Sequence, residues 1–490
     1  MSTFEQSPSD ILSRLTELRA ADAPTHGGHV LSYVYDSGLA ELDALASDAM
    51  KLVQPVNGLD PTTFTSVAVM EGEVVAFARS LLGGDADVVG SVTTGGTESC
   101  LLAVKTARDN WTGTGKPRLL APVTVHAAFQ KAAHYFGLEL DLVPVLSSGV
   151  VSAEALIERM GADVALVVVS APSYPHAALD PIALVAAAAA ERGIACHVDA
   201  CIGGFVLPFW PGLPDWDLRV PGVTSLSADL HKFGYAPKGA SVLLQRGRDR
   251  QRSQYFATTQ WPGYPVVNAT MLGSKSAGPL AAAWAIIHAL GTPGFAALAE
   301  SCVRSTSSLV SLIESIEGLR VVGEPVGPLL AVATDDSVPV ERRVDPHHWA
   351  DQARAHGWLL QLQPGLAQSD GTALPHTTHL TITPVTEAVL PELSAALVKA
   401  ADEVRGEPAV SPSDVLAALP DGMLEGLGAG ERGLDSETAF AVLQGIGLVS
   451  ADASLPDRMA PFLALIAALP APLTERLLTE LLARVVEPRA

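Results

Sequence analysis

The feature that most constrains the fold is a regular alternation of strand and helix patterns from residue 64 to residue 198. The strand-like runs are rich in Val and Leu and lie at 88–92, 118–124, 164–169 and 194–198. Before and between these runs, apolar residues recur with helical spacing at 66–82, 98–110, 127–136 and 181–192. Helices of this length between strands require crossover connections, so we expect an α/β fold with a mostly parallel sheet that is covered on both faces.

The remainder of the chain divides into three further regions. Residues 1–63 hold two helical patterns, at 8–20 and 39–51, around a Gly-rich loop, and predict an N-terminal arm. The sheet pattern belongs to a large domain at 64–300. Strand patterns within 318–334 and 376–385, with helical patterns at 345–356 and 388–404, predict a small α+β domain at 301–404. Residues 405–490 predict a helical extension, with one apolar helix face formed by Leu473, Leu477, Leu481 and Val485.

Composition narrows the classes of function. A net charge of -22 disfavours nucleic acids and anionic membranes as partners, because both would be repelled. The four cysteines form no CxxC pair, and the N-terminus has no basic region followed by an apolar run, so we expect a cytoplasmic protein with reduced thiols. Apolar runs such as PLAAAWAIIHALG are shorter than the ~18 residues that span a bilayer, so we expect them in the core and expect no membrane insertion.

A Gly-Gly-Thr turn joins the first strand to the next helix. In VTTGGTESC, the backbone N–H groups near Gly96 and the hydroxyl of Thr97 would lie at the positive end of that helix, which suits a phosphate. An ordinary strand-to-helix turn with Thr97 as the N-cap is an alternative interpretation of the same sequence.

Two further residues match other parts of one cofactor. Asp199 ends an apolar strand, where open α/β sheets bind ligands, although an Asp there also serves as a turn residue. Lys232, in SADLHKFGYAPKGAS, would lose its proton more easily in a desolvated pocket and could react with an aldehyde. His126 follows a strand and could stack on an aromatic ring or simply cap a helix. Phosphate site, ring-nitrogen carboxylate and amine occur in the order that predicts pyridoxal 5′-phosphate (PLP).

Four motifs resemble one known family. TTGGTESCLLAVKTARD, HAAFQKAAHYFG, HVDACIGGFVLPF and SADLHKFGYAPKGAS look like sphingosine-1-phosphate lyase, within the group II PLP-dependent decarboxylases of fold type I, the aspartate aminotransferase fold. The resemblance extends from about residue 28 to 290 and does not include the C-terminal extension.

The resemblance implies roles for individual residues. It makes Lys232 the lysine that binds the cofactor aldehyde, Asp199 the partner of the ring nitrogen and His126 the residue stacked on the ring. Gly96, Thr97 and His231 would contact the phosphate.

Four more residues follow from the same motifs. Ser170 and Ser274 would contact the cofactor. Tyr35 and Lys238 would assist the chemistry or bind a substrate phosphate.

Three departures from the lyase motifs concern the substrate. NGLDPT has Gly58 and Asp60 where the lyases have a histidine-containing stretch, GSKS has Lys275 in place of an arginine, and SAPS has Ser173 in place of an asparagine. These changes leave the predicted cofactor site intact and count against a phosphorylated sphingoid substrate.

The sequence leaves the reaction open. Either the Cα–Cβ bond of a 2-amino-3-hydroxy compound breaks, with Tyr35 or Lys238 as the base, or the bond to a carboxylate breaks in an amino acid decarboxylase. A non-catalytic scaffold is a third, less favoured interpretation. The resemblance also implies a homodimer with shared active sites, to which Tyr35 or the 273–276 loop of the neighbour contributes.

Overall fold

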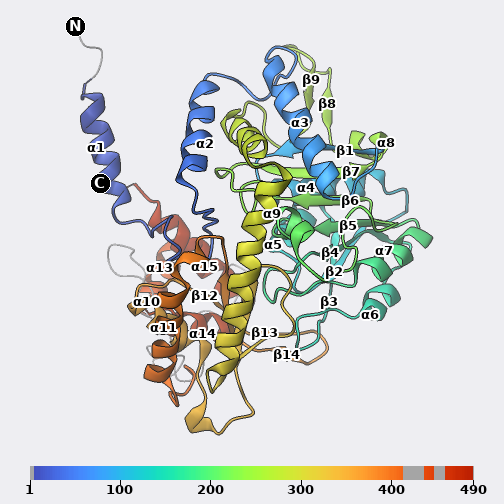
Figure 1. Ribbon diagram of the computed structural model, residues 1–490. Helices are drawn as coiled ribbons and strands as arrows, with labels where there is room; N and C mark the ends of the chain where they lie inside the picture. Colours follow the sequence, from blue (N-terminus) through green and yellow to red (C-terminus); the bar gives the residue numbers. More distant parts are fainter. Residues whose placement is uncertain (1–4, 412–434, 446–457, 489–490) are drawn as a thin grey trace.

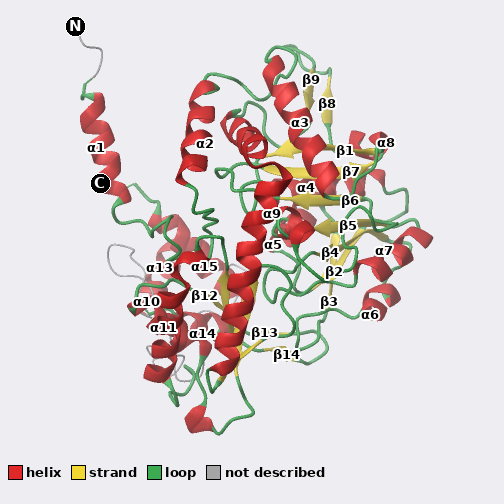
Figure 2. Cartoon of the chain, viewed as in Figure 1, coloured by secondary structure: helices red, strands yellow, loops and turns green. Residues whose placement is uncertain are grey.

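We describe the chain from a computed structural model, which describes residues 5–411, 435–445 and 458–488. Its centre is a seven-stranded sheet in the order β1-β7-β6-β5-β4-β2-β3 (Figures 1 and 2). The strands are β1 (Val88–Thr93), β2 (Arg118–Pro122), β3 (Glu139–Val143), β4 (Val164–Ser170), β5 (Ala195–Asp199), β6 (Ser225–Ala228) and β7 (Ser241–Arg246). All neighbouring strands pair in parallel except β7, which is antiparallel to both β1 and β6. The prediction of a mostly parallel sheet is therefore confirmed.

Helices cover both faces of this sheet because its strands carry apolar residues on both sides. In β4, Leu166 and Val168 pack with α4 and α5, whereas Val167 and Val169 belong to the core on the opposite face. Such continuous apolar strands are typical of a buried parallel sheet. The helices of this domain are α3 (Thr65–Leu81), α4 (Gly96–Asn110), α5 (Ala127–Phe136), α6 (Ala153–Glu158), α7 (Ile182–Glu191) and α8 (Arg248–Arg252).

One long helix, α9 (Gly278–Ser315), runs from the large sheet to the small one (Figure 1). It passes through residue 300, and its backbone leaves helical geometry at Gly291, next to Pro293. Among the described residues it is the one helix with the length and apolar composition of a membrane span. Leu280, Ile286 and Phe295 on this helix are buried in the core of the large domain. The apolar sequence of the first half of the helix predicted this burial.

The second sheet has the order β10-β11-β15-β12 and is antiparallel. Its strands are β10 (Leu319–Val321), β11 (Leu329–Thr334), β12 (Gln361–Gln363) and β15 (Thr377–Thr381). Its helices, α10 (Pro346–Ala355) and α11 (Thr386–Val404), pack on each other. Two short hairpins form separate two-stranded sheets: β8 (Phe256–Thr258) with β9 (Val266–Asn268), and β13 (Leu366–Ala367) with β14 (Ala373–Leu374).

The ends of the chain form the periphery. Helix α1 (Pro8–Arg19) extends away from the other elements and buries no residue, whereas α2 (Ala40–Leu52) packs on α9 (Figure 1). The described part of the C-terminal extension consists of α13 (Ser436–Gly445), α14 (Ala460–Ala468) and α15 (Ala471–Val485). Of the residues on the predicted apolar face, Leu477 and Leu481 are buried, whereas Val485 is 47% exposed. The parts of this extension at 412–434 and 446–457 lie outside the described residues.

Candidate active site

The turn between β1 and α4 forms one end of the candidate site. Gly95 precedes the helix with a φ of 149°, a conformation that favours glycine, and no side chain caps the first turn of α4. Thr97 is therefore the second residue of the helix and not its N-cap. The free N–H groups at this helix start are suited to bind an anion.

Close packing explains why the next residue is also glycine. A Cβ atom added to Gly96 would lie 2.6 Å from Oδ2 of Asp229, and one added to Gly95 would lie 3.1 Å from Cε1 of His231. Glu98 secures the turn from behind, because its carboxylate accepts hydrogen bonds from the N–H and hydroxyl of Thr94 and from the N–H of Met271.

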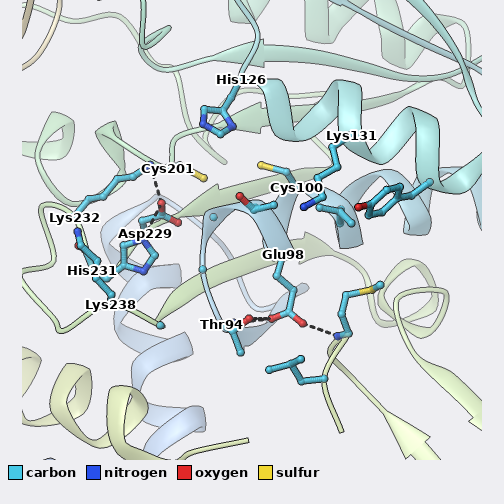
Figure 3. A pocket seen from close by; sticks show the side chains of 18 residues that line it. Thr94, Glu98, Cys100, His126, Lys131, Cys201, Asp229, His231, Lys232 and Lys238 are labelled. Atoms are coloured by element: carbon cyan, nitrogen blue, oxygen red, sulfur yellow. Dashed lines mark hydrogen bonds and ion pairs between the residues drawn. The ribbon is translucent and has the colours of Figure 1, made fainter. Parts of the chain in front are cut away.

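Lys232 forms a buried ion pair with a residue to which the motifs gave no role. Its Nζ lies 2.8 Å from Oδ2 of Asp229, three positions earlier in the chain (Figure 3). Burial alone would lower the pKa of Lys232, but the carboxylate of Asp229 raises it well above its ordinary value. Conversely, burial would raise the pKa of Asp229, whereas the charges of Lys232 and His231 hold it below its usual range. The expectation that Lys232 loses its proton easily is therefore wrong for this arrangement, in which the ammonium has a carboxylate partner.

The strand ends of the central sheet supply the other side of the site. Asp199 ends β5 and Ser170 ends β4, and these two residues are register partners. Oδ1 of Asp199 accepts a hydrogen bond from the N–H of Cys201, so the residue fills the turn role and faces the cavity as well. The N–H of Ser170 donates to Asp180, whose pKa is raised to about 7 by burial.

His126 fills the capping role that its position suggested, and it also lines the cavities at Lys232. It is the N-cap of α5, because its Nδ1 accepts a hydrogen bond from the N–H of Ala128 at 3.2 Å. That bond leaves Nε2 to carry the proton in the neutral ring. His126 lines both cavities that meet at Lys232.

Tyr35 and Lys238 lie together next to Lys232. The Nζ of Lys238 is 4.6 Å from the centre of the Tyr35 ring and donates a hydrogen bond to the carbonyl of His231. Burial and the charge of Lys232 lower the pKa of Lys238 to about 8. Burial raises the pKa of Tyr35 to about 12. Because Tyr35 reaches the site of its own chain, the expectation that the neighbour could supply it was wrong.

Two adjoining cavities surround these residues. One, of about 610 Å³, contains the Gly95–Thr97 turn, His231 and Lys238; the other, of about 370 Å³, contains Tyr35, Ser170 and Asp199. Lys232, His126 and Cys201 line both. The second cavity also includes Tyr174, which stacks on His379 with ring centres 4.2 Å apart and which no sequence motif indicated.

Ser274 was predicted to contact the cofactor, but it lines neither of the two cavities at Lys232. It accepts a hydrogen bond from Asn57 and lines a separate cavity with Gly58, Asp60 and Lys275. The carboxylate of Asp60 accepts hydrogen bonds from Thr62 and Thr63, which lower its pKa, so this departure from the lyase motif stabilises a local turn within the chain.

The residues around Lys232 fit the predicted cofactor. An uncapped helix start with two glycines suits a phosphate, a carboxylate at the end of β5 suits a protonated ring nitrogen, and a lysine within the same space suits an aldehyde. Ser173, the third departure, accepts a hydrogen bond from the N–H of Ala178 and shapes a buried turn.

Comparisons with known proteins agree with this geometry. The family model described as "Pyridoxal-dependent decarboxylase conserved domain" matches residues 29–333, and one described as "Pyridoxal-dependent enzyme, C-terminal putative HTH domain" matches residues 412–484. Sphingosine-1-phosphate lyase of Dictyostelium discoideum is 38% identical over 64% of this chain and 60% of its own length. That of Oryza sativa is 33% identical over 82% of this chain and 74% of its own length.

Solved structures give the same result. The sphingosine-1-phosphate lyase of Burkholderia pseudomallei, 31% identical, superimposes with a TM-score of 0.75 over 83% of this chain and 93% of that one. Glutamate decarboxylase of Lactobacillus brevis, at 17% identity and a TM-score of 0.71, shares the fold. The chain spans about 60% of the length of the first curated relatives that it matches. It belongs to the PLP-dependent decarboxylase family, among its members similar to sphingosine-1-phosphate lyase.

Proposed function

We propose that the protein is a PLP-dependent carbon-carbon lyase that cleaves the Cα–Cβ bond of a 2-amino-3-hydroxy compound, with a phosphorylated sphingoid base as the substrate class. The names of the relatives support this reaction. The observation that carries the proposal is the position of a second amine, Lys238, beside Lys232 and Tyr35, because a retro-aldol cleavage needs a base at the substrate hydroxyl.

When bound, PLP accepts the electrons of the bond that breaks next to the amino group. Asp199 would keep the ring nitrogen protonated, Lys232 would hold the aldehyde, and His126 would cover one ring face. Asp229 orients Lys232 through their ion pair and neutralises its charge within the buried site.

Lys238 is the group best suited to remove the hydroxyl proton. With a pKa of about 8, a substantial part of its amine is neutral near physiological pH and can accept a proton. Tyr35, with a pKa of about 12, stays a phenol and can donate a hydrogen bond to the developing oxygen. The two side chains therefore divide the acid and base roles between them.

The types of side chain that line the two cavities favour this reaction over amino acid decarboxylation. Among the described residues that line the two cavities there is no arginine, the side chain best suited to hold a substrate carboxylate with two hydrogen bonds. The basic side chains there are amines and imidazoles: Lys131, Lys232, Lys238, His126 and His231.

A homodimer with shared sites is part of the proposal. Large side chains that line the cavity of about 610 Å³ are exposed, namely Tyr135, Met271 and Leu272, with exposed fractions of 46 to 60%. A second subunit would bury them and bring its own 273–276 loop within reach of this site.

Product analysis tests the function. The purified protein with PLP is offered phosphorylated 3-hydroxy amines and, separately, amino acids, and released aldehyde and CO2 are measured. The proposal predicts an aldehyde and a phosphorylated amine from the hydroxy amines, with Lys232→Ala inactive. CO2 from amino acids without any aldehyde would establish the decarboxylase instead.

A further inference from the structure

Three potential metal ligands converge at the floor of the active-site cavity. The sulfur atoms of Cys100 and Cys201 and a carboxylate oxygen of Asp199 all lie within 4.8 Å of one another. Figure 3 shows the two sulfur atoms pointing toward each other. Both thiols also line the larger cavity, so a small ion has a route to them.

Rigid elements hold these ligands in place. Cys100 lies on the buried face of α4, Asp199 ends β5, and Cys201 follows it by two residues. The side chains are almost fully buried, with residue exposures of 1% for Cys100, 7% for Cys201 and 8% for Asp199. Binding a metal would thus require only small side-chain movements, because tetrahedral Zn²⁺ places its ligand atoms roughly 3.5 Å apart at bond lengths of about 2.0 to 2.3 Å.

The two thiols are buried beside the carboxylates of Asp199 and Asp229 and the ammonium of Lys232. The hydrogen bond with Cys100, then burial and the carboxylates of Asp199 and Asp229, raise the pKa of Cys201 well above its ordinary value. Because the thiolate is the metal ligand, a cation that binds here must displace the thiol protons.

We propose that Cys100, Cys201 and Asp199 form a binding site for a thiophilic divalent cation of the Zn²⁺ or Cd²⁺ type when the cofactor is absent. The cation displaces one proton from each thiol, and two thiolates and one carboxylate bind it, with the fourth position open to water.

A hydrogen-bonded chain behind Cys201 supports this site. The thiol donates to the hydroxyl of Ser227 at 3.3 Å, and Ser227 lies 3.1 Å from Nε2 of His197. After the thiol loses its proton, the Ser227 hydroxyl can donate to the thiolate instead. Such partners of metal ligands raise metal affinity.

The site would make cation and cofactor compete. This part rests on the proposed role of Asp199 as the partner of the ring nitrogen, because one carboxylate cannot serve the cofactor and the metal together. A thiophilic cation would then block loading of the cofactor-free protein and spare the loaded enzyme.

The test uses the full-length protein freed of cofactor and titrated with ZnCl2. We expect the release of about two protons per Zn²⁺ and an X-ray absorption spectrum with two sulfur ligands at about 2.3 Å. Cys100→Ser and Cys201→Ser should each weaken Zn²⁺ binding by about 100-fold or more. Cys196→Ser and Cys302→Ser are matched controls, since both remove a buried cysteine elsewhere and should bind Zn²⁺ like the wild type. Prior saturation with PLP should weaken Zn²⁺ binding.

The proposal would be overturned by a Zn²⁺ adduct without sulfur ligands, or by Zn²⁺ affinity that is unchanged in both Cys100→Ser and Cys201→Ser. The spectrum of the wild-type adduct reports the sulfur ligands even if a variant fails to fold. Equal Zn²⁺ affinity with and without PLP would refute the competition. If the protein binds Zn²⁺ through sulfur but never takes up PLP, the metal site is supported and only the proposed function is refuted.

Discussion

Replacing Asp229 by Asn would leave the Lys232 ammonium buried without its counter-charge. The pair is 2.8 Å apart, and the side chains are 1% and 19% exposed, so water screens it weakly. Breaking a buried ion pair by removing one partner costs about 3 to 5 kcal/mol. We therefore expect Asp229→Asn to lower the free energy of unfolding of the cofactor-free protein by about this amount in urea at pH 7.

The pH dependence of this loss follows from the pKa shifts. The raised pKa of Lys232 contributes stability that is complete below the ordinary lysine value of 10.5 and is lost as the pH rises through the folded-state value. The lowered pKa of Asp229 contributes stability above its ordinary 3.8 and loses it as the pH falls. The difference between wild type and Asp229→Asn should thus be largest between these limits and shrink above about pH 10.5.

A second substitution provides the decisive comparison. Adding Lys232→Met removes the unpaired charge, so the double variant should be more stable than Asp229→Asn alone. Asp163→Asn is a control, because Asp163 is 51% exposed in its pair with Arg118 and should cost about 1 kcal/mol or less. A double variant that is less stable than the single one would refute the assigned role of the ion pair.

Three further changes test other parts of the site. If Lys238 is the base, kcat/KM should rise as the pH passes about 8, and Lys238→Met should remove this rise and lower kcat by about 10²-fold or more; an unchanged profile would exclude the role. Gly96→Ala would place a methyl group 2.6 Å from Asp229, so PLP affinity, measured by absorbance titration, should fall at least about tenfold; unchanged affinity would contradict the close packing. Glu98→Gln should weaken the hydrogen bond from the Met271 N–H by about 1 to 3 kcal/mol and speed hydrogen exchange there; unaltered exchange would refute the anchoring role.

Much of this site could be predicted because local sequence carries its chemistry. The strand ends at Ser170 and Asp199, the glycine turn and Lys232 are each adjacent to a clear apolar strand or a motif. Parallel strands bring such ends to one edge of a sheet, so their order in the chain predicted their meeting in space.

What could not be predicted depends on contacts between distant segments. The same SADLHK motif contains Asp229, but only the fold shows that its carboxylate faces Lys232 and reverses the expected direction of the lysine pKa. Tyr35 is far from Lys232 in sequence, and no local pattern states which chain supplies it. The antiparallel pairing of β7 likewise depends on how residues 229–240 turn, since a strand has the same periodicity in either direction.

The most direct test of the central claim is the product of one reaction. Wild-type protein with PLP and a phosphorylated 2-amino-3-hydroxy base should release aldehyde and phosphorylated amine in equal amounts, measured by mass spectrometry. Borohydride should fix the cofactor to Lys232 in the same preparation. Cofactor attached to Lys232 without any aldehyde from such substrates would contradict the lyase that we propose.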